Sequence, residues 1–263
     1  MTLAASGEHS RLTVVALRGA RDRDTTLLNM SKETRHYDIT SRMSQVVTAH
    51  PQLLMVMQRL GIALGLGDRS IDEVCRQSYV DTAFFMLLLD VVTSEDYVPP
   101  LQRTLTTDMS LLVPYLRASH AYYVNLRLPH IEQHLHNIAR QLPSRMASVF
   151  NSFFDDYKRE VAEHFAHEEQ MVYPHVEALQ RGERDQSYRI DTFIANHGNL
   201  QDKLDDLLQI IFRYLPPTVT ADDDLLEAVF DILQISSDLS KHSLIEERVL
   251  VPYVSHLEAT VKQ

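Results

Sequence analysis

Cysteine is nearly absent from this sequence: its 263 residues include a single cysteine. A single cysteine excludes an intramolecular disulfide and any metal site built from cysteine alone. It is also typical of a reducing, intracellular compartment, so we expect a cytoplasmic protein. Glycine is scarce too, with seven residues, and the hydrophobic fraction is 44%. Together these features favour a compact, helix-rich globular protein.

Basic residues are too few to balance the acidic ones: 25 Lys and Arg face 36 Asp and Glu, for a formal net charge of −11. This balance argues against nucleic-acid binding and against docking on an anionic membrane. Long hydrophobic runs are also missing. The longest candidate, 83–92, has about ten residues and contains Asp90, whereas a membrane span needs about 20. We therefore expect neither nucleic-acid nor membrane partners.

The positions of proline, glycine and apolar residues divide the chain into four parts. The first has no clear pattern and is expected to be an arm. The second is a small module of about three helices, the third is a linker containing two adjacent prolines, and the fourth holds four long helical stretches. These parts cover residues 1–33, 34–92, 93–108 and 109–260.

Helix-start signals support the small module. A glycine-rich turn at 61–67 precedes Ser70, and Glu73 follows Ser70 three residues later, which is a capping-box pattern. Asp81 is expected to begin the next helix. In the fourth part, short connections between four helices predict an all-α, up-down-up-down four-helix bundle.

Histidines interrupt the apolar seams of the bundle helices. Apolar residues recur every three or four positions, yet each of the four seams carries one histidine, and two add a glutamate one turn later. These residues are His120, His164, Glu168, His197, His242 and Glu246. An unpaired ionised carboxylate in a core is very costly. Residues four apart share a helix face, so a metal cluster satisfies all six side chains at once.

The two His-x-x-x-Glu motifs belong to an internal repeat. Segments 164–179 and 242–257 align without a gap and share His, two Glu, Pro, Val and Leu at equal positions. This indicates a duplicated helix pair. The second glutamates, Glu169 and Glu247, are expected to be exposed or to hold the metal ligands in place.

Four imidazoles and two carboxylates form a mixed nitrogen and oxygen ligand set. Structural zinc needs four ligands, commonly with cysteine, and calcium and magnesium prefer oxygen. In a helical bundle this set favours two iron ions bridged by carboxylates and an oxo group, with manganese as the alternative. Three ligands per metal leave positions open for a diatomic or peroxide ligand.

The order His, His-x-x-x-Glu, His, His-x-x-x-Glu resembles the hemerythrin-like superfamily, and within it the di-iron "repair of iron centres" family. The resemblance covers 109–258 and implies that the six residues bind two irons. It also implies a role in nitrosative and oxidative stress: iron-centre repair, iron donation, or reaction with nitric oxide or peroxide. Damaged iron–sulfur proteins would then be partners.

Residues 60–75 resemble more weakly the N-terminal domain of that family, where a Cys-Cys-Gly-Gly turn is usual. Here Gly65 and Leu66 replace the cysteines, and only Cys75 remains, as an expected buried thiol. The replacement argues against thiol-assisted iron transfer.

The first ligand histidine departs from the family spacing. Pro129 lies nine residues after His120 rather than eight, and one residue rotates a helix by about 100°. His130 and His134 are therefore alternatives to His120. Tyr123 either hydrogen-bonds a metal-bound ligand or packs in the core.

Two further functions fit the same residues. One is a sensor of oxygen, nitric oxide or redox state that signals to a regulatory protein through the N-terminal module, or a related oxygen-binding protein. The other is a metal-free interaction protein. A homodimer is compatible with either.

Overall fold

A computed structural model describes residues 37–183, 187–196, 200–216, 219 and 223–260. Residues 38–263 belong to one compact unit. The predicted arm, 1–33, and the candidate ligand His197 lie outside the described residues. Within the described ranges every regular element is a helix, and one isolated bridge joins Arg42 to Ser70, which confirms the all-α prediction.

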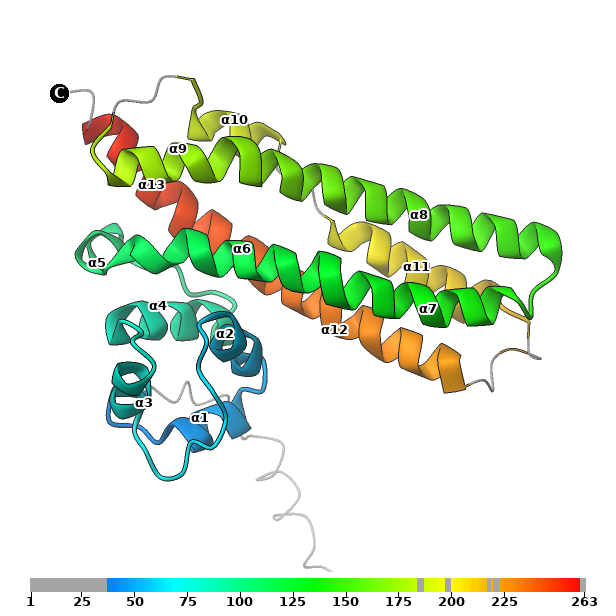
Figure 1. Ribbon diagram of the computed structural model, residues 1–263, viewed down its shortest axis with the longest axis horizontal. Coiled ribbons are helices and arrows are strands. Elements are labelled where there is room, and N and C mark those ends of the chain that lie inside the picture. Colours follow the sequence, from blue (N-terminus) through cyan, green and yellow to red (C-terminus); the bar gives the residue numbers. More distant parts are fainter. Residues whose placement is uncertain (1–36, 184–186, 197–199, 217–218, 220–222, 261–263) are drawn as a thin grey trace, which may run out of the picture. The chain divides into compact units, whose positions relative to one another are not determined.

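The N-terminal module contains four helices, one more than the sequence pattern predicts. They are α1 (Met43–Ala49), α2 (Leu53–Arg59), α3 (Ile71–Gln77) and α4 (Thr82–Thr93), shown in blue and cyan in Figure 1. The capping box is present: the Ser70 hydroxyl accepts a hydrogen bond from the Glu73 N–H at 3.2 Å, and the Glu73 carboxylate accepts from the Ser70 N–H at 2.8 Å. Asp81 caps α4 by accepting from the Phe84 N–H at 2.7 Å.

The predicted linker, 93–108, includes the short helix α5 (Leu101–Thr106), which begins directly after Pro100. Proline suits a helix start because the first N–H groups of a helix have no partner inside it. Arg103 of α5 donates hydrogen bonds to Asp90 at 2.7 Å and to the Tyr97 hydroxyl at 2.5 Å. These contacts hold the segment against α4.

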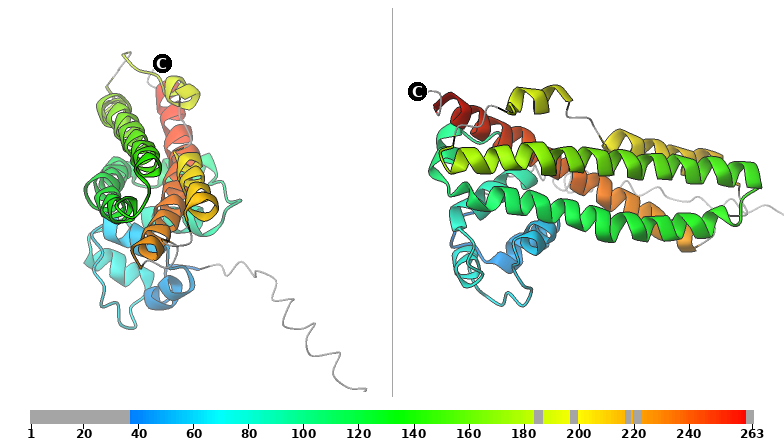
Figure 2. Two further views of the ribbon diagram at one scale, coloured as in Figure 1. Left: turned by 90° about the vertical axis from the view of Figure 1, so that its right-hand side faces the viewer. Right: turned by 45° about the horizontal axis from the view of Figure 1, so that its top comes forward.

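The rest of the unit is a bundle of four helical rods. In order they are η1 (Met109–Leu111), α6 (Leu112–Tyr122), η2 (Tyr123–Arg127) and α7 (Leu128–Ala139); α8 (Ser144–His167), η3 (Glu168–Val172) and α9 (Tyr173–Gln180); α10 (Ile190–Asn196) and α11 (Gln201–Tyr214); and α12 (Asp223–Ile245), η4 (Glu246–Leu250) and α13 (Val251–Thr260). Successive rods run in opposite directions, as Figures 1 and 2 show. Contacts of α7 with α8, α8 with α11, α11 with α12 and α12 with α7 close the bundle.

Apolar side chains fill the bundle on the α7 side of the histidines. This core includes Ile131, Leu135, Phe150, Phe154, Leu204, Leu207, Ile232 and Leu239. Each such side chain contributes about 1.5–3 kcal/mol by leaving water. The module joins this structure through contacts of α4 with α12 and of α2 with α6. No helix in the described part of the chain is long and apolar enough to cross a membrane.

Three rods contain a π-helical segment, and each segment precedes a proline. In η2, η3 and η4 the residue before Pro129, Pro174 or Pro252 donates its N–H to the carbonyl five residues earlier. Proline has no N–H and its ring clashes with the carbonyl four residues earlier in an α-helix. A π turn inserts one residue into the helix and so accommodates the proline.

The inserted residue changes which side chains face the core. A regular α-helical seam would bury Val124 and Met171, but these residues are 40% and 42% exposed. Tyr123 and Val172 are fully buried instead. The predicted seams therefore hold up to His120 and Glu168 and are displaced within η2 and η3, whereas in η4 both Glu246 and Val249 are buried as a regular seam requires.

Candidate metal centre

Two of the π segments begin at glutamates of the repeat. Glu168 opens η3 and Glu246 opens η4, while His164 and His242 lie one turn earlier in α8 and α12. His120 lies in α6, three residues before η2 begins. π-helical turns occur frequently at functional sites. Their presence beside these histidines and glutamates therefore indicates a functional site in this part of the bundle.

Four buried side chains from three rods converge at this centre. One ligand atom from each of His120, Glu168, His242 and Glu246 lies within 4.8 Å of the others. Nε2 of His120 lies 3.3 Å from Nε2 of His242 and 3.0 Å from Oε2 of Glu168. Oε1 of Glu246 lies 3.2 Å from Nε2 of His242. All four residues are at most 4% exposed.

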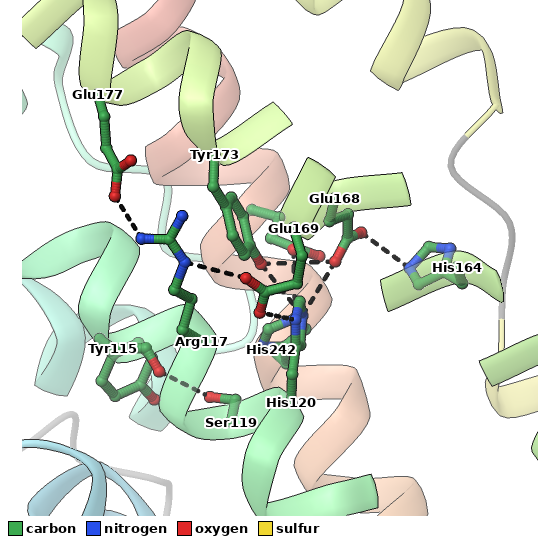
Figure 3. Close-up of polar contacts among 11 residues, drawn as sticks. Tyr115, Arg117, Ser119, His120, His164, Glu168, Glu169, Tyr173, Glu177 and His242 are labelled. Atoms are coloured by element: carbon green, nitrogen blue, oxygen red, sulfur yellow. Dashed lines mark hydrogen bonds and ion pairs between the residues drawn. The ribbon is translucent and has the colours of Figure 1, made fainter. Parts of the chain in front are cut away.

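His164 lies at the edge of this group. Its Nε2 is 2.9 Å from Oε1 of Glu168, while the other oxygen of Glu168 faces His120. Figure 3 shows Glu168 between the two imidazoles. Glu168 therefore contacts both histidines, with one carboxylate oxygen toward each. The His164 side chain is 16% exposed, more than the four central residues.

The structure does not describe one predicted ligand, His197, and it places the two alternative ligands, His130 and His134, elsewhere. His197 lies outside the described residues, although its seam neighbours Phe193 and Leu200 are buried. His130 and His134 contact aspartates of α12 instead of this centre, so they are not alternatives to His120. The physical reason is that η2 takes up the extra residue after His120, which leaves the direction of this histidine unchanged.

The surroundings of Glu168 favour its ionised form. Burial and the nearby charge of Glu246 raise the pKa of Glu168, but hydrogen bonds from His120 and His164 outweigh them and hold that pKa below its usual value. The centre therefore favours an ionised carboxylate in a place without water. A bound cation compensates such a charge.

A series of polar contacts holds His120 at Nδ1, the ring nitrogen that faces away from the other central residues. Oε1 of Glu169 lies 3.0 Å from Nδ1 of His120, and Arg117 donates to the other oxygen of Glu169 at 2.9 Å (Figure 3). Arg117 also donates to Glu177. A metal-binding histidine usually has its other ring nitrogen held by a carboxylate in this way, and here Nε2 is the nitrogen of His120 that faces the centre. Glu169 thus contacts a predicted metal ligand, which is one of the two roles expected for the second glutamates of the repeat.

Tyr173 is part of the centre, and the sequence reasoning missed it. Its hydroxyl lies 3.1 Å from Nε2 of His120 and 3.4 Å from Oε2 of Glu168. Burial, followed by the charges of the two central glutamates, raises the pKa of Tyr173 well above its usual value, so its hydroxyl keeps its proton. The available signal was Pro174, because a proline within a helix interrupts the regular hydrogen bonds and indicates a local irregularity there.

Tyr123 links the centre to the N-terminal module. Its ring packs edge-on against His242, with centroids 5.9 Å apart, and its hydroxyl accepts a hydrogen bond from Arg59 of α2 at 3.1 Å. Arg59 also forms an ion pair with Asp238, one turn before His242 on α12. Tyr123 is therefore a core residue whose hydroxyl is directed to Arg59.

The donor set fits a first-row transition metal. Imidazole nitrogens and carboxylate oxygens are the ligands that iron and manganese accept in helical bundles. The centre places two imidazole nitrogens 3.3 Å apart beside two buried carboxylates, which is a set of donors that a cation can share. Nδ1 of His242 is also buried without a hydrogen-bond partner in the described part of the chain, so polar groups here are not arranged as a self-sufficient core.

Comparison with known proteins agrees with this chemistry. A family model described as the hemerythrin HHE cation-binding domain matches residues 111–254, more than half of the chain. No curated protein and no solved structure gave a significant match. The matched range contains the four central residues and all three π segments. The chain belongs to the hemerythrin family of HHE cation-binding domains.

Proposed function

We propose that this chain is a non-haem di-iron protein of the nitrosative and oxidative stress response, similar to the repair of iron centres family. One observation carries the proposal: four buried His and Glu ligand atoms lie within 4.8 Å of one another. The proposed iron ligands are His120, His164, Glu168, His197, His242 and Glu246. Manganese is the alternative metal. When bound, a pair of ferrous ions supplies electrons and open positions for nitric oxide or peroxide.

The protein residues prepare the site in three ways. Glu169 fixes the imidazole of His120, so that its Nε2 is directed to the centre. Phe165 stacks on this imidazole at 4.0 Å between ring centroids and helps to exclude water. Tyr173 keeps its proton and lies beside His120, where its hydroxyl can donate a hydrogen bond to a small ligand.

Reaction with nitric oxide or peroxide is favoured over thiol-assisted iron donation. Cys75 is fully buried in α3, and burial raises the pKa of its thiol to about 12. A thiol with this pKa is almost entirely protonated near neutral pH, and the thiolate is the form that binds metals. Iron release to a damaged iron–sulfur protein would therefore proceed without help from cysteine.

Anaerobic titration of the ferrous protein with nitric oxide tests the proposal. We expect rapid nitric oxide consumption and a change in the visible spectrum. A double variant, Glu168→Gln with Glu246→Gln, should lose both the iron and the reaction. Glu247→Gln is the matched control, because Glu247 adjoins Glu246 but is exposed. Retention of iron and reactivity in the double variant would contradict the proposal.

A sensor is the second candidate function, and the Arg59 contacts favour it. Arg59 of the module touches Tyr123, which packs on His242, so a change at His242 has a direct path to α2. Hydrogen exchange tests this: nitric oxide should alter exchange in α2 of the wild type and not in Arg59→Met. A reversible oxygen-dependent absorption band would instead indicate oxygen binding, and absence of any metal would favour a metal-free interaction protein.

A further inference from the structure

A second group of metal-binding side chains lies where α7 packs against α12. Nδ1 of His130 lies 2.5 Å from Oδ2 of Asp231, and Nδ1 of His134 lies 2.7 Å from Oδ1 of Asp224. One ligand atom from each of His130, His134 and Asp231 lies within 4.8 Å of the other two. Figure 1 shows these two helices side by side.

Helix geometry brings these residues together. His130 and His134 are four apart and share one face of α7, with ring centroids 4.7 Å apart. Asp224 and Asp231 are two turns apart on α12, and their order is reversed relative to the histidines because the helices are antiparallel. His130 is ten residues beyond His120, roughly 15 Å along the helix axis, so this group is separate from the candidate metal centre.

Neighbouring donors hold the two carboxylates in place. Arg127 donates to Oδ1 of Asp231 at 2.8 Å, and Asn137 donates to Oδ2 of Asp224 at 3.0 Å. Each of these contacts uses the carboxylate oxygen that does not face a histidine. The charge of Arg127 faces Asp231, and that of Arg140 acts on Asp224. The group therefore offers a cation two imidazoles beside carboxylates that are already held in place.

Access from solvent is available at His130. Its side chain is 48% exposed, whereas that of Asp231 is 11% exposed and that of His134 is 16% exposed. An ion can therefore enter from the surface without opening the bundle. The partly buried aspartate provides the fixed ligand, and the exposed histidine can rotate to complete the site.

We propose that His130, His134 and Asp231 bind one divalent transition-metal ion of the zinc, cobalt and nickel class, with Asp224 beside it. Two imidazoles and a carboxylate form the ligand set of open zinc sites, in which water takes the fourth position. Ligand atoms around a tetrahedral zinc ion lie about 3.3 Å apart. Because the three ligand atoms already lie within 4.8 Å, side-chain rotation alone closes the site. The proposal does not depend on iron at the bundle centre.

Cobalt titration of the full-length, iron-loaded protein tests this site. Under anaerobic conditions, we expect a single cobalt ion per chain, seen in the visible spectrum and by calorimetry, with no loss of iron. His134→Ala should weaken cobalt binding by about tenfold or more, because mutation of a residue that merely holds a metal ligand in place already lowers metal affinity by about tenfold. His136→Ala is the matched control, because His136 lies on the same helix but is exposed and outside the group.

Three results would overturn the proposal: no cobalt binding by the wild type, equal affinity in His134→Ala, or cobalt uptake that displaces iron. His130→Ala provides a second variant should His134→Ala fail to fold, since His130 is half exposed and its loss leaves the core intact. It should weaken cobalt binding to a similar extent. Undiminished affinity in this folded variant would count equally against the site.

Discussion

Removal of the Arg59–Asp238 ion pair should cost more stability than any surface ion pair of this chain. The Arg59 side chain is 1% exposed and that of Asp238 is 10% exposed. Two guanidinium nitrogens face the two carboxylate oxygens, with Nη1 at 3.0 Å from Oδ1. Asp238→Asn would leave the arginine charge buried among the side chains of Tyr115, Tyr122 and Tyr123 without an opposite charge on residue 238.

The expected loss follows from the burial of this pair. Breaking a buried ion pair on one side typically costs about 3–5 kcal/mol of unfolding free energy. Coulomb attraction at about 4 Å with an effective dielectric of about 20 gives about 4 kcal/mol, in the same range. Because asparagine can still accept one hydrogen bond from Arg59, we expect Asp238→Asn to cost about 3 kcal/mol.

Urea unfolding of the metal-free protein measures this loss without a contribution from metal binding. A double-mutant cycle with Arg59→Met and Asp238→Asn should give a coupling of about 2–4 kcal/mol. Arg76→Met is the matched control, because Arg76 pairs with Asp72 on the surface of α3 with its side chain 76% exposed. It should cost less than about 0.5 kcal/mol. A coupling below about 0.5 kcal/mol for the buried pair would refute the reasoning.

Three further outcomes are expected. Tyr173→Phe removes the hydroxyl that contacts His120 and should lower the stability of the metal-free protein by about 1 kcal/mol in urea unfolding; an unchanged stability would contradict this. Cys75 should react with maleimide only after denaturation, since it is buried and its pKa is about 12; rapid labelling of the native protein would disprove its burial. A hydrogen bond from His134 lowers the pKa of Asp224 in the folded protein. This contact therefore stabilises the fold above the ordinary pKa of aspartate, and the stabilisation is lost as the pH falls through the lower pKa of the folded state. Asp224→Asn should reduce the loss of stability in acid, and an acid transition identical to that of the wild type would contradict this.

Much of the bundle follows from the sequence because its signals are local. The seam of the third rod is spaced at three and four residues, and Ile190, Leu204 and Ile211 are buried as that spacing requires. Ser70 caps α3 through the same hydrogen bonds that the capping-box pattern describes. Such features depend on neighbouring residues, so a single chain reveals them.

The π segments are the main difference between expectation and structure. An uninterrupted α-helix places Met171 on the inner face, yet the extra residue in η3 exposes it and brings Tyr173 to His120. Pro174 was the clue, since a proline well inside a helical pattern requires a local change of hydrogen bonding. Its equivalent in the first rod, Pro129, explains why the unusual spacing after His120 leaves that histidine at the centre.

Contacts between distant segments could not be read from periodicity. Arg59 ends a short helix of the module, and nothing in its neighbourhood in the sequence indicates Asp238 as its partner, 179 residues away. The same holds for the facing pairs of α7 and α12, where the histidines of one helix meet aspartates of another about 100 residues later. These contacts depend on how the rods pack.

Iron content per chain tests the central claim most directly. Protein purified anaerobically should contain about two iron ions per chain, as expected for a di-iron carboxylate site in a helical bundle. The double variant His164→Ala with His242→Ala should contain almost none while retaining its helical circular dichroism. Two irons in that variant, or a wild type that neither contains metal nor takes up ferrous iron, would contradict the account.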